Sequence, residues 1–353
     1  MAMTADVVII GGGATGASTA YHLAKRGVKN VLLVEKQFLA SGPTGRSSAC
    51  VRQHYSTPET CRLVLKALRF FERFEEHTGG RTAGFVRTGY LLGVDDRLRK
   101  AMESSVQLQQ SQGIDSRLIT PAEARAIEPR LAIDDLTGAC YEPEAGYADP
   151  AQTTAGFAAA AREMGVKIME ETSVTGIRVA GDRVSAVETS RGPIETRTVL
   201  NAAGTWAQHL GRAVGVEVPI TVCRHKIALV EWPADAQGPH PMVYDFVTNI
   251  YTRPETGNMI LVGPLDSEEL EDRARLGLEI ARDIGAALVG QRGLARQVDG
   301  PAALADHRGR EGARLLHIGL VEVFGGAGMP GSNKDGRDRK GDLSHLGLSG
   351  YSG

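Results

Sequence analysis

The sequence has few cysteines and few aromatic residues, and it lacks any long apolar run. Only four cysteines occur among the 353 residues, namely Cys50, Cys61, Cys140 and Cys223, and none forms a Cys-x-x-Cys pair or another metal-ligand spacing. This pattern predicts reduced thiols, with neither a metal site nor a disulfide framework. No apolar stretch approaches the roughly 20 residues that a membrane-spanning helix needs.

A strong net charge is also missing. Lys and Arg number 40 against 42 Asp and Glu, for a formal net charge of −2. This balance creates no global field, and no local basic patch stands out, so we expect neither nucleic acid nor a membrane as a partner. The N-terminus leads directly into a strand pattern without the basic, apolar and cleavage-site parts of a secretory signal, which predicts a cytoplasmic protein.

What the sequence does contain is a βαβ pattern at its start. The length of 353 residues favours two domains over one. Val7–Ile10 is an apolar run typical of a strand buried on both faces, and a helix is predicted from Ala17 to Lys25. A second buried strand, Val31–Val34, follows, and a turn at Gly181-Asp182 predicts a hairpin further on.

The turn inside this βαβ unit carries a dinucleotide-binding pattern. Gly11-Gly12-Gly13-Ala14-Thr15-Gly16 fits G-x-G-x-x-G and has its full context of strand, helix, second strand and terminal acid. Gly11 permits the tight turn, Gly13 lets the backbone approach a diphosphate, and Gly16 lets the helix pack closely on the strand. The helix N-terminus faces the phosphates with free N–H groups. Glu35 is placed to accept hydrogen bonds from a ribose.

FAD and NAD both bind such units, and the loop after Glu35 favours FAD. This loop offers many backbone and hydroxyl donors that could lie along an extended cofactor near its diphosphate and flavin ring. The candidate residues are Ser41, Thr44, Gly45, Arg46, Ser47 and Ser48.

These motifs resemble the D-amino-acid oxidase superfamily of FAD-dependent oxidoreductases, most closely its sarcosine oxidase β-subunit and glycine oxidase type. The resemblance begins with the Gly11–Gly16 turn, Glu35-Lys36 and the segment 41–52. It continues with Gly146-Tyr147-Ala148-Asp149-Pro150, with Asn201-Ala202-Ala203-Gly204-Thr205-Trp206 and with the hairpin pattern 251–263. It therefore spans residues 5 to about 265.

The resemblance implies an α/β fold in which a Rossmann-type FAD-binding domain is interleaved with an antiparallel-sheet substrate domain. Residues 1–80, 145–215 and part of 266–325 are assigned to the FAD-binding domain, and 81–144 and 216–265 to the substrate domain. The implied cofactor is non-covalent FAD. Lys36, Val174, Ala203, Gly204 and Trp206 are implied as further cofactor contacts.

The chain departs from the family pattern in two places. The sequence after about residue 270 does not resemble the family pattern. Residues 326–353 are rich in Gly, which predicts a disordered or aberrant tail. The strand Met259–Val262 also lacks the lysine that oxygen-reactive sarcosine oxidases carry over the flavin, which leaves the electron acceptor open.

The predicted chemistry is flavin-dependent oxidation of the C–N bond of a small amino acid or secondary amine, such as a sarcosine-, glycine- or proline-like compound. Arg52, in its Arg-x-x-Tyr context with Tyr55, resembles the carboxylate-binding arginine of the subgroup, and Arg253 is the second candidate. The candidates for orienting the amine or accepting its proton are His54, His225 and Tyr251.

Two alternative functions stay open from the sequence. One is a non-catalytic or inactive flavin-binding subunit, which the departure of the C-terminal sequence from the family pattern favours. The other is an NAD-linked Rossmann dehydrogenase, against which the Asn201 motif and the loop 41–52 speak. Partner subunits or a homo-oligomer are expected besides the small-molecule substrate.

Overall fold

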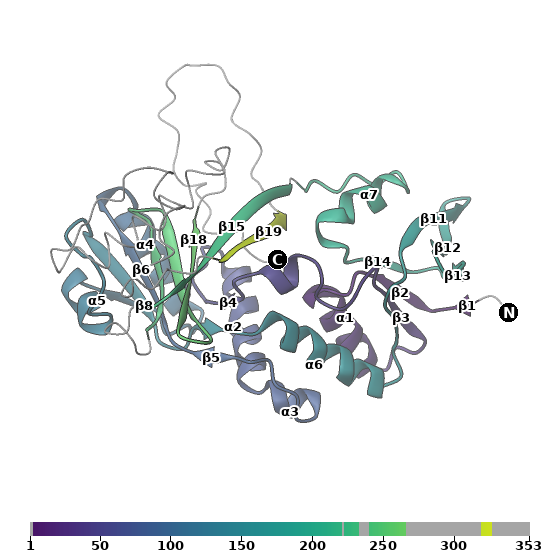
Figure 1. The fold of residues 1–353 in the computed structure, drawn as a ribbon, viewed down its shortest axis with the longest axis horizontal. Helices are drawn as coiled ribbons and strands as arrows, with labels where there is room; N and C mark the ends of the chain where they lie inside the picture. The colour runs from purple at the N-terminus through teal and green to yellow at the C-terminus, as the bar shows by residue number, and fades with distance from the viewer. Residues whose placement is uncertain (1–2, 221, 233–239, 266–318, 327–353) are drawn as a thin grey trace, which may run out of the picture.

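The structure is a computed structural model that describes residues 3–220, 222–232, 240–265 and 319–326. Its elements form two lobes that lie next to each other along the long axis of the molecule (Figure 1). The chain builds part of the first lobe, crosses to the second, returns, and crosses again. This arrangement confirms the predicted fold class, a Rossmann-type unit interleaved with a second, sheet-rich domain.

The first lobe is built on a parallel sheet with the strand order β10-β3-β2-β14. Its strands are β2 (Val7–Ile10), β3 (Val31–Val34), β10 (Lys167–Met169) and β14 (Val199–Asn201). The helix α1 (Ala14–Lys25) connects β2 to β3. The predicted βαβ unit is therefore present, although α1 begins three residues before the predicted start, because the end of the glycine turn is already helical.

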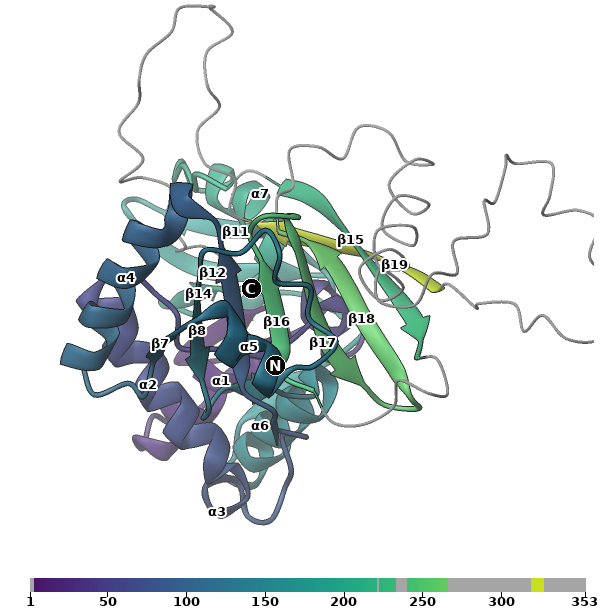
Figure 2. The same ribbon diagram turned by 90° about the vertical axis from the view of Figure 1, so that its left-hand side faces the viewer.

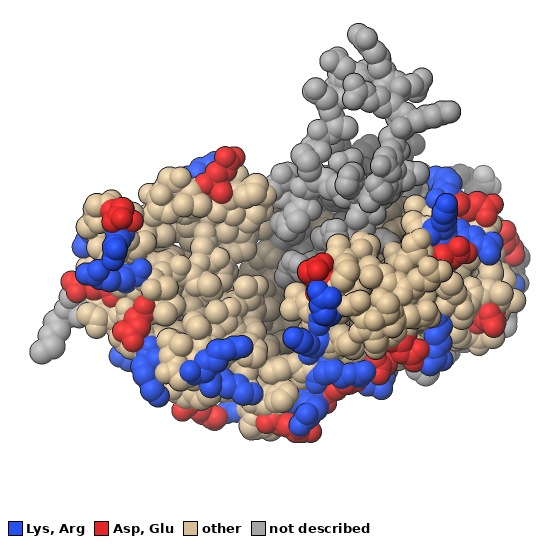
Figure 3. Space-filling model, turned by 180° about the vertical axis from the view of Figure 1, so that it is seen from behind, with Lys and Arg blue, Asp and Glu red and all other residues tan. Residues whose placement is uncertain are grey.

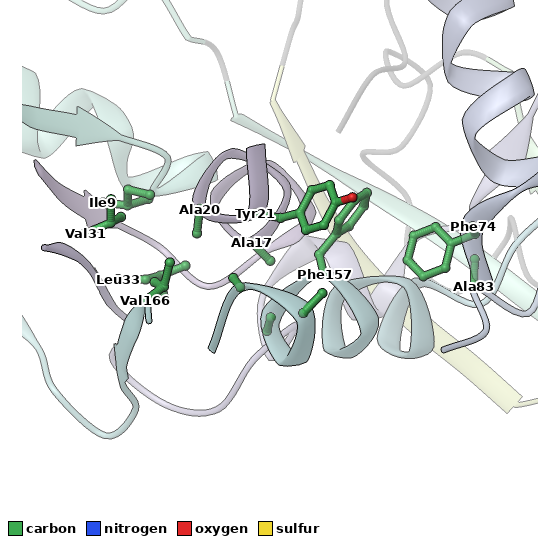
Figure 4. Packing of buried hydrophobic residues seen from close by; sticks show 13 residues of the cluster. Ile9, Ala17, Ala20, Tyr21, Val31, Leu33, Phe74, Ala83, Phe157 and Val166 are labelled. Atoms are coloured by element: carbon green, nitrogen blue, oxygen red, sulfur yellow. The ribbon is translucent and has the colours of Figure 1, made fainter. Parts of the chain in front are cut away.

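One face of this sheet is covered by α1 and α6 (Pro150–Glu163), as Figure 4 shows. Alanines on both helices let them approach each other closely. Phe157 of α6 contacts Tyr21 of α1, with ring centroids 5.4 Å apart, and Phe74 of α3 (Phe74–Thr78), with centroids 4.9 Å apart. These aromatic contacts fix the helices that support the glycine turn.

The other face of the parallel sheet is covered by a second sheet with the order β1-β13-β12-β11. Its strands are β1 (Met3–Thr4), β11 (Val174–Ala180), β12 (Arg183–Thr189) and β13 (Ile194–Glu195). β11 and β12 pair in antiparallel fashion around Gly181-Asp182, as predicted. Val187 and Ile194 pack with Val8 and Leu32, whose side chains alternate with those facing the helices.

The second lobe contains an eight-stranded sheet with the order β19-β15-β18-β17-β16-β6-β8-β7. The strands are β6 (Tyr90–Val94), β7 (Arg117–Ile119), β8 (Gly138–Glu142), β15 (Val222–Glu231), β16 (Met242–Asp245), β17 (Ile250–Glu255), β18 (Met259–Pro264) and β19 (Gly319–Gly326). All neighbours pair in antiparallel fashion except β6 and β16, which are parallel and come from separate passes of the chain through this lobe. Figure 2 shows β15, β16, β17 and β18 side by side in this sheet.

The remaining elements connect and cover these sheets. They are β4 (Cys50–Val51), β5 (Val86–Arg87), β9 (Gly146–Tyr147), α2 (Pro58–Glu72), α4 (Asp96–Ser111), α5 (Pro121–Ile127), α7 (Ala207–Arg212) and the 3₁₀ helices η1 (Pro43–Arg46) and η2 (Gly204–Trp206). α4 packs on the face of the large sheet that carries Tyr90, whereas α5 packs on the face that carries Leu91. The face with Tyr90 is the one that carries the candidate substrate residues.

Predictions on residues 266–318 and 327–353 lie outside the described residues, whereas residues 319–326 form β19 beside β15. Within the described ranges, no helix is both long and apolar enough to cross a membrane. No cluster of three or more potential metal-ligating side chains occurs in this part of the chain either. Cys50, Cys61 and Cys140 are free thiols.

Candidate functional site

The glycine turn lies where the carboxyl ends of β2 and β14 meet. Gly11 has φ +112°, and a Cβ atom on it would lie 2.3 Å from the carbonyl oxygen of Ala202. A Cβ on Gly16 would lie 1.9 Å from the carbonyl oxygen of Gly11. Only glycine therefore allows the β2–α1 turn to pack this closely against the chain that follows β14.

The N-terminus of α1 is arranged to receive an anion. Gly13 caps this helix without a side-chain hydrogen bond, and the first turn contains no acidic residue. The Ala14 N–H lies 3.2 Å from Thr44 Oγ1, and a Cβ on Gly13 would lie 2.8 Å from the same oxygen. The backbone N–H groups and the partial positive charge of the helix end fit a diphosphate, provided that position 13 has no side chain.

Glu35 is fixed beside this turn at the end of β3. Its Oε2 accepts a hydrogen bond from Gly12 N at 2.7 Å, and its Oε1 accepts one from Gln37 N at 2.9 Å. Its side chain is buried. Because a carboxylate has about four lone-pair sites, Glu35 keeps acceptor capacity for ribose hydroxyls.

The other predicted cofactor residues lie around the same edge. Lys36 Nζ lies 3.3 Å from the ring centroid of Trp206, a cation–π contact that joins the segment after β3 to η2. Val174 and Ala203 pack against the apolar cluster between the two sheets of the first lobe, which contains Val8 and Ile194. Ser41, Thr44, Gly45, Arg46, Ser47 and Ser48 form the loop that contains η1, and Gly204 begins η2. The structure thus brings these residues together, and their contacts with a cofactor stay a prediction.

A group of aromatic side chains lines one face of the eight-stranded sheet. Tyr244 of β16 lies opposite Tyr251 of β17, with ring centroids 5.2 Å apart. The ring centroid of Tyr90 of β6 lies 4.8 Å from that of Tyr244, and the ring centroid of His225 of β15 lies 6.4 Å from that of Tyr251. A Cβ on Gly263 would lie 2.5 Å from Tyr251 Cε1, so this glycine makes room for the tyrosine ring.

Arg52 extends into this aromatic group from the segment that follows β4. Its guanidinium carbon lies 4.6 Å from the ring centroid of Tyr55 and 5.8 Å from that of Tyr244. Burial acts to lower the pKa of Arg52, but interactions with Tyr55, Tyr90, Tyr244 and Glu142 raise the pKa above the ordinary arginine value. Arg52 therefore stays charged, as a carboxylate-binding residue must.

His54 lies beneath this group. Its side chain has no exposed surface, and its Nδ1 lies 3.2 Å from Oε1 of Glu142, which is equally buried. The Cys140 sulfur lies 3.6 Å from the same nitrogen. This position favours a role in holding the segment 52–55 over contact with a substrate.

Arg253 lies on the same face of the sheet, but its guanidinium already has partners. Nη1 donates to the carbonyl oxygen of Pro254 at 2.7 Å, and Nη2 donates to Glu255 Oε2 at 2.8 Å. The guanidinium carbon also lies 4.6 Å from the ring centroid of Tyr147. Arg52 also donates a hydrogen bond, from Nη1 to the carbonyl oxygen of His54, but Arg253 already pairs with a carboxylate. Of the two predicted arginines, Arg52 is therefore the better placed to bind a substrate carboxylate.

Both histidines border the aromatic group: the His54 ring lies 6.0 Å from that of Tyr90 and is held by Glu142, whereas the His225 ring is stacked on that of Tyr251. Burial lowers the pKa of His225, and a hydrogen bond with the backbone of Pro264 opposes this only in part. The imidazole is therefore neutral at neutral pH and able to accept a proton.

Sequence reasoning missed Tyr90, Glu142, Tyr244 and Gly263. Tyr90 meets Tyr244 and Glu142 only through pairing with strands distant in the sequence. Gly263 and Tyr244 meet Tyr251 across neighbouring strands, but a hairpin pattern alone does not show which side chains share a face. An acid such as Glu142 at the end of an otherwise apolar strand is the one local signal that could have found a member of this set.

The surface behind the view of Figure 1 carries charges of both signs (Figure 3). Among the described residues, Lys and Arg lie close to Asp and Glu around its rim. The described part of this face therefore presents no extended surface of one charge.

Comparison with known proteins places this site in a family context. A family described as FAD dependent oxidoreductase matches residues 6–310. Mitochondrial sarcosine dehydrogenase of Mus musculus is 35% identical over 286 residues, which cover 78% of this chain and 31% of that protein. Sarcosine oxidase subunit beta of Arthrobacter sp is 33% identical over 226 residues, covering 61% of this chain and 55% of that one.

A solved structure agrees with these matches. The crystal structure of L-proline dehydrogenase from P. horikoshii has a TM-score of 0.73 and 29% sequence identity, covering 82% of this chain and 77% of that chain. The family match confirms the resemblance drawn from the sequence motifs, and it decides for FAD over NAD as the cofactor. The match to the mouse sarcosine dehydrogenase spans only about a third of that protein.

Proposed function

This chain belongs to the FAD-dependent oxidoreductase family, and we propose that it oxidises the C–N bond of a small amino acid or secondary amine. The observation that carries this proposal is the Arg52 guanidinium among aromatic side chains, where its fork suits a carboxylate. Relatives named for sarcosine and L-proline support a substrate that carries a carboxylate near its nitrogen.

In this proposal the first lobe holds the cofactor. The N–H groups at the start of α1 bind the diphosphate, the turn Gly11–Gly16 allows its close approach, and Glu35 accepts hydrogen bonds from the ribose. Bound FAD supplies a two-electron acceptor for the hydride that leaves the carbon attached to the nitrogen.

The second lobe prepares the substrate. Arg52 binds the carboxylate and fixes the position of the neighbouring carbon. His225, neutral because burial lowers its pKa, accepts a proton from the substrate ammonium and leaves the nitrogen with a free electron pair. Loss of hydride then forms a C=N bond, and water hydrolyses the resulting imine to a carbonyl compound and an amine.

Assembly and location are part of the same proposal. The similarity to a protein named as subunit beta supports association with partner subunits. We retain the cytoplasm as the proposed location, although the mouse relative is named as a mitochondrial protein.

Replacing Arg52 tests the proposal. Arg52→Met removes charge-assisted hydrogen bonds worth about 1.5–3 kcal/mol, so KM for sarcosine, L-proline or glycine should rise roughly 10- to 100-fold. Pyrrolidine and dimethylamine, which lack the carboxylate, should react as they do with the unaltered protein. Arg69→Met, which changes an exposed arginine on α2, is the matched control. An unchanged KM for the carboxylate substrates in Arg52→Met would contradict the proposal.

A further inference from the structure

A fully buried carboxylate anchors the chain segment that presents Arg52. Glu142 lies at the end of β8, and its side chain has no exposed surface. Its Oε2 accepts a hydrogen bond from Gln53 N at 2.8 Å, and its Oε1 lies 3.2 Å from His54 Nδ1. Both contacts are to the two residues that directly follow Arg52.

The anchored segment in turn holds the guanidinium. Arg52 Nη1 donates to the carbonyl oxygen of His54 at 2.6 Å. The next carbonyl, that of Tyr55, accepts from Gln109 Nε2 of α4 at 3.1 Å. The segment 52–55 is therefore tied to β8 and to α4, and the tie to β8 is the one that lies next to Arg52.

Solvation explains why a carboxylate in this position is informative. Burying a charged group costs several kcal/mol unless hydrogen bonds compensate for the lost water. Glu142 receives that compensation from a backbone N–H and an imidazole of the segment 52–55, and its charge also interacts favourably with the nearby Arg52 guanidinium. An apolar side chain could fill the same space on β8 but could not fix the segment.

We propose that Glu142 is a positioning residue that orients Arg52 toward the substrate carboxylate by holding Gln53 N and the His54 ring. This inference rests on the proposed role of Arg52 in binding that carboxylate. The hydrogen bonds from Glu142 to Gln53 N and to His54 Nδ1 hold the segment that presents Arg52. A variant that keeps them should preserve carboxylate binding, and one that cannot reach both partners should weaken it.

Two substitutions separate hydrogen bonding from charge. Glu142→Asp keeps the charge but shortens the side chain by one methylene, so it cannot span both partners. Glu142→Gln loses the charge but keeps the length: its amide oxygen can accept from Gln53 N, and its amide nitrogen can donate to His54 Nδ1 in the other tautomer. Glu128→Asp, a buried acid of the same lobe that pairs with Arg130, is the matched control.

The probe is methoxyacetate, which has the shape of sarcosine with oxygen in place of nitrogen, compared with neutral methoxyacetamide. Calorimetric titration of the FAD-loaded full chain should show methoxyacetate binding on the order of tenfold weaker in Glu142→Asp, because a misplaced binding group loses its geometry. Glu142→Gln and Glu128→Asp should stay within about threefold of the unaltered protein. Methoxyacetamide binding should not change in any variant.

A second background distinguishes the failure of this inference from the failure of the proposed function. In Arg52→Met, which should itself weaken methoxyacetate binding, adding Glu142→Asp should have no further effect. If Arg52→Met binds methoxyacetate normally, the proposed role of Arg52 is wrong. If Arg52→Met weakens binding but Glu142→Asp does not, or if Glu142→Gln weakens it equally, the positioning role is overturned. Should Glu142→Asp fail to fold, His54→Leu removes the same hydrogen bond from the other side, and unchanged binding there overturns the role equally.

Discussion

Gly13→Ala is the perturbation that best isolates the proposed diphosphate cradle from the stability of the fold. The residue has φ −79° and ψ −176°, a conformation that alanine adopts without strain. The added Cβ would lie 2.8 Å from Thr44 Oγ1, the end of a short side chain that can rotate away. The folded apoprotein should therefore lose no more than about 1 kcal/mol, the value of the Ala14–Thr44 hydrogen bond.

The effect on the cofactor should be larger. A methyl group at this position keeps the backbone from approaching the diphosphate and removes at least one charge-assisted hydrogen bond, worth about 1.5–3 kcal/mol. The Kd for FAD should rise roughly 10- to 100-fold, measured by titrating apoprotein and following flavin fluorescence. Gly176→Ala is the control, since its Cβ would be 3.9 Å from Glu188 in ordinary contact.

Two outcomes would refute this reasoning. In the first, Gly13→Ala binds FAD as tightly as the unaltered protein, so the backbone at position 13 is not close to the diphosphate. In the second, the apoprotein loses as much unfolding free energy as the cofactor loses binding free energy. The substitution would then act through the fold and not through the cradle.

Two further predictions concern the core and the proposed base. Phe157→Ala should lower the free energy of unfolding by about 3–5 kcal/mol in denaturant titrations, because Phe157 packs against Tyr21 and Phe74 (Figure 4). Phe38→Ala, at an exposed position, is the control and should change the free energy of unfolding by less than about 0.5 kcal/mol. Similar losses for both would contradict the packing described. For His225, the base must be neutral, so the rate of substrate oxidation should fall as pH drops through its pKa; since burial lowers that pKa, the acid limb of the pH–rate profile should lie below the ordinary histidine value of about 6.5. His225→Gln should abolish this limb, and its persistence would assign it to another group.

The parts of the site that the sequence predicts are those whose constraints are local. Gly11, Gly13 and Gly16 follow from a turn of fixed geometry, and Glu35 follows from the strand that it ends. The helix after the turn was predicted from its apolar pattern, and only its start was misplaced, because Ala14 to Gly16 are already helical. Arg52 was accessible through its short motif with Tyr55.

The rest of the site depends on strand pairing over long separations. Tyr90 and Tyr244 meet because β6 and β16 run in parallel, and a hairpin pattern cannot predict that pairing. His54 looked like a candidate base because histidine titrates in the useful range, but its burial against Glu142 depends on β8. The register between strands that are distant in the sequence decides which side chains face the substrate. A single sequence does not predict that register.

The most direct test of the account is the absorbance spectrum of the FAD-loaded protein under anaerobic conditions. Sarcosine, L-proline and glycine are added in turn. The account predicts that the oxidised flavin band disappears with at least one of them, and that Arg52→Met requires far higher concentrations of that compound for the same change. If the protein takes up FAD but no small amino acid or secondary amine alters the band, the chain is a flavin-binding subunit without this activity. If it takes up no FAD at all, the cradle at residues 11–16 does not function as described.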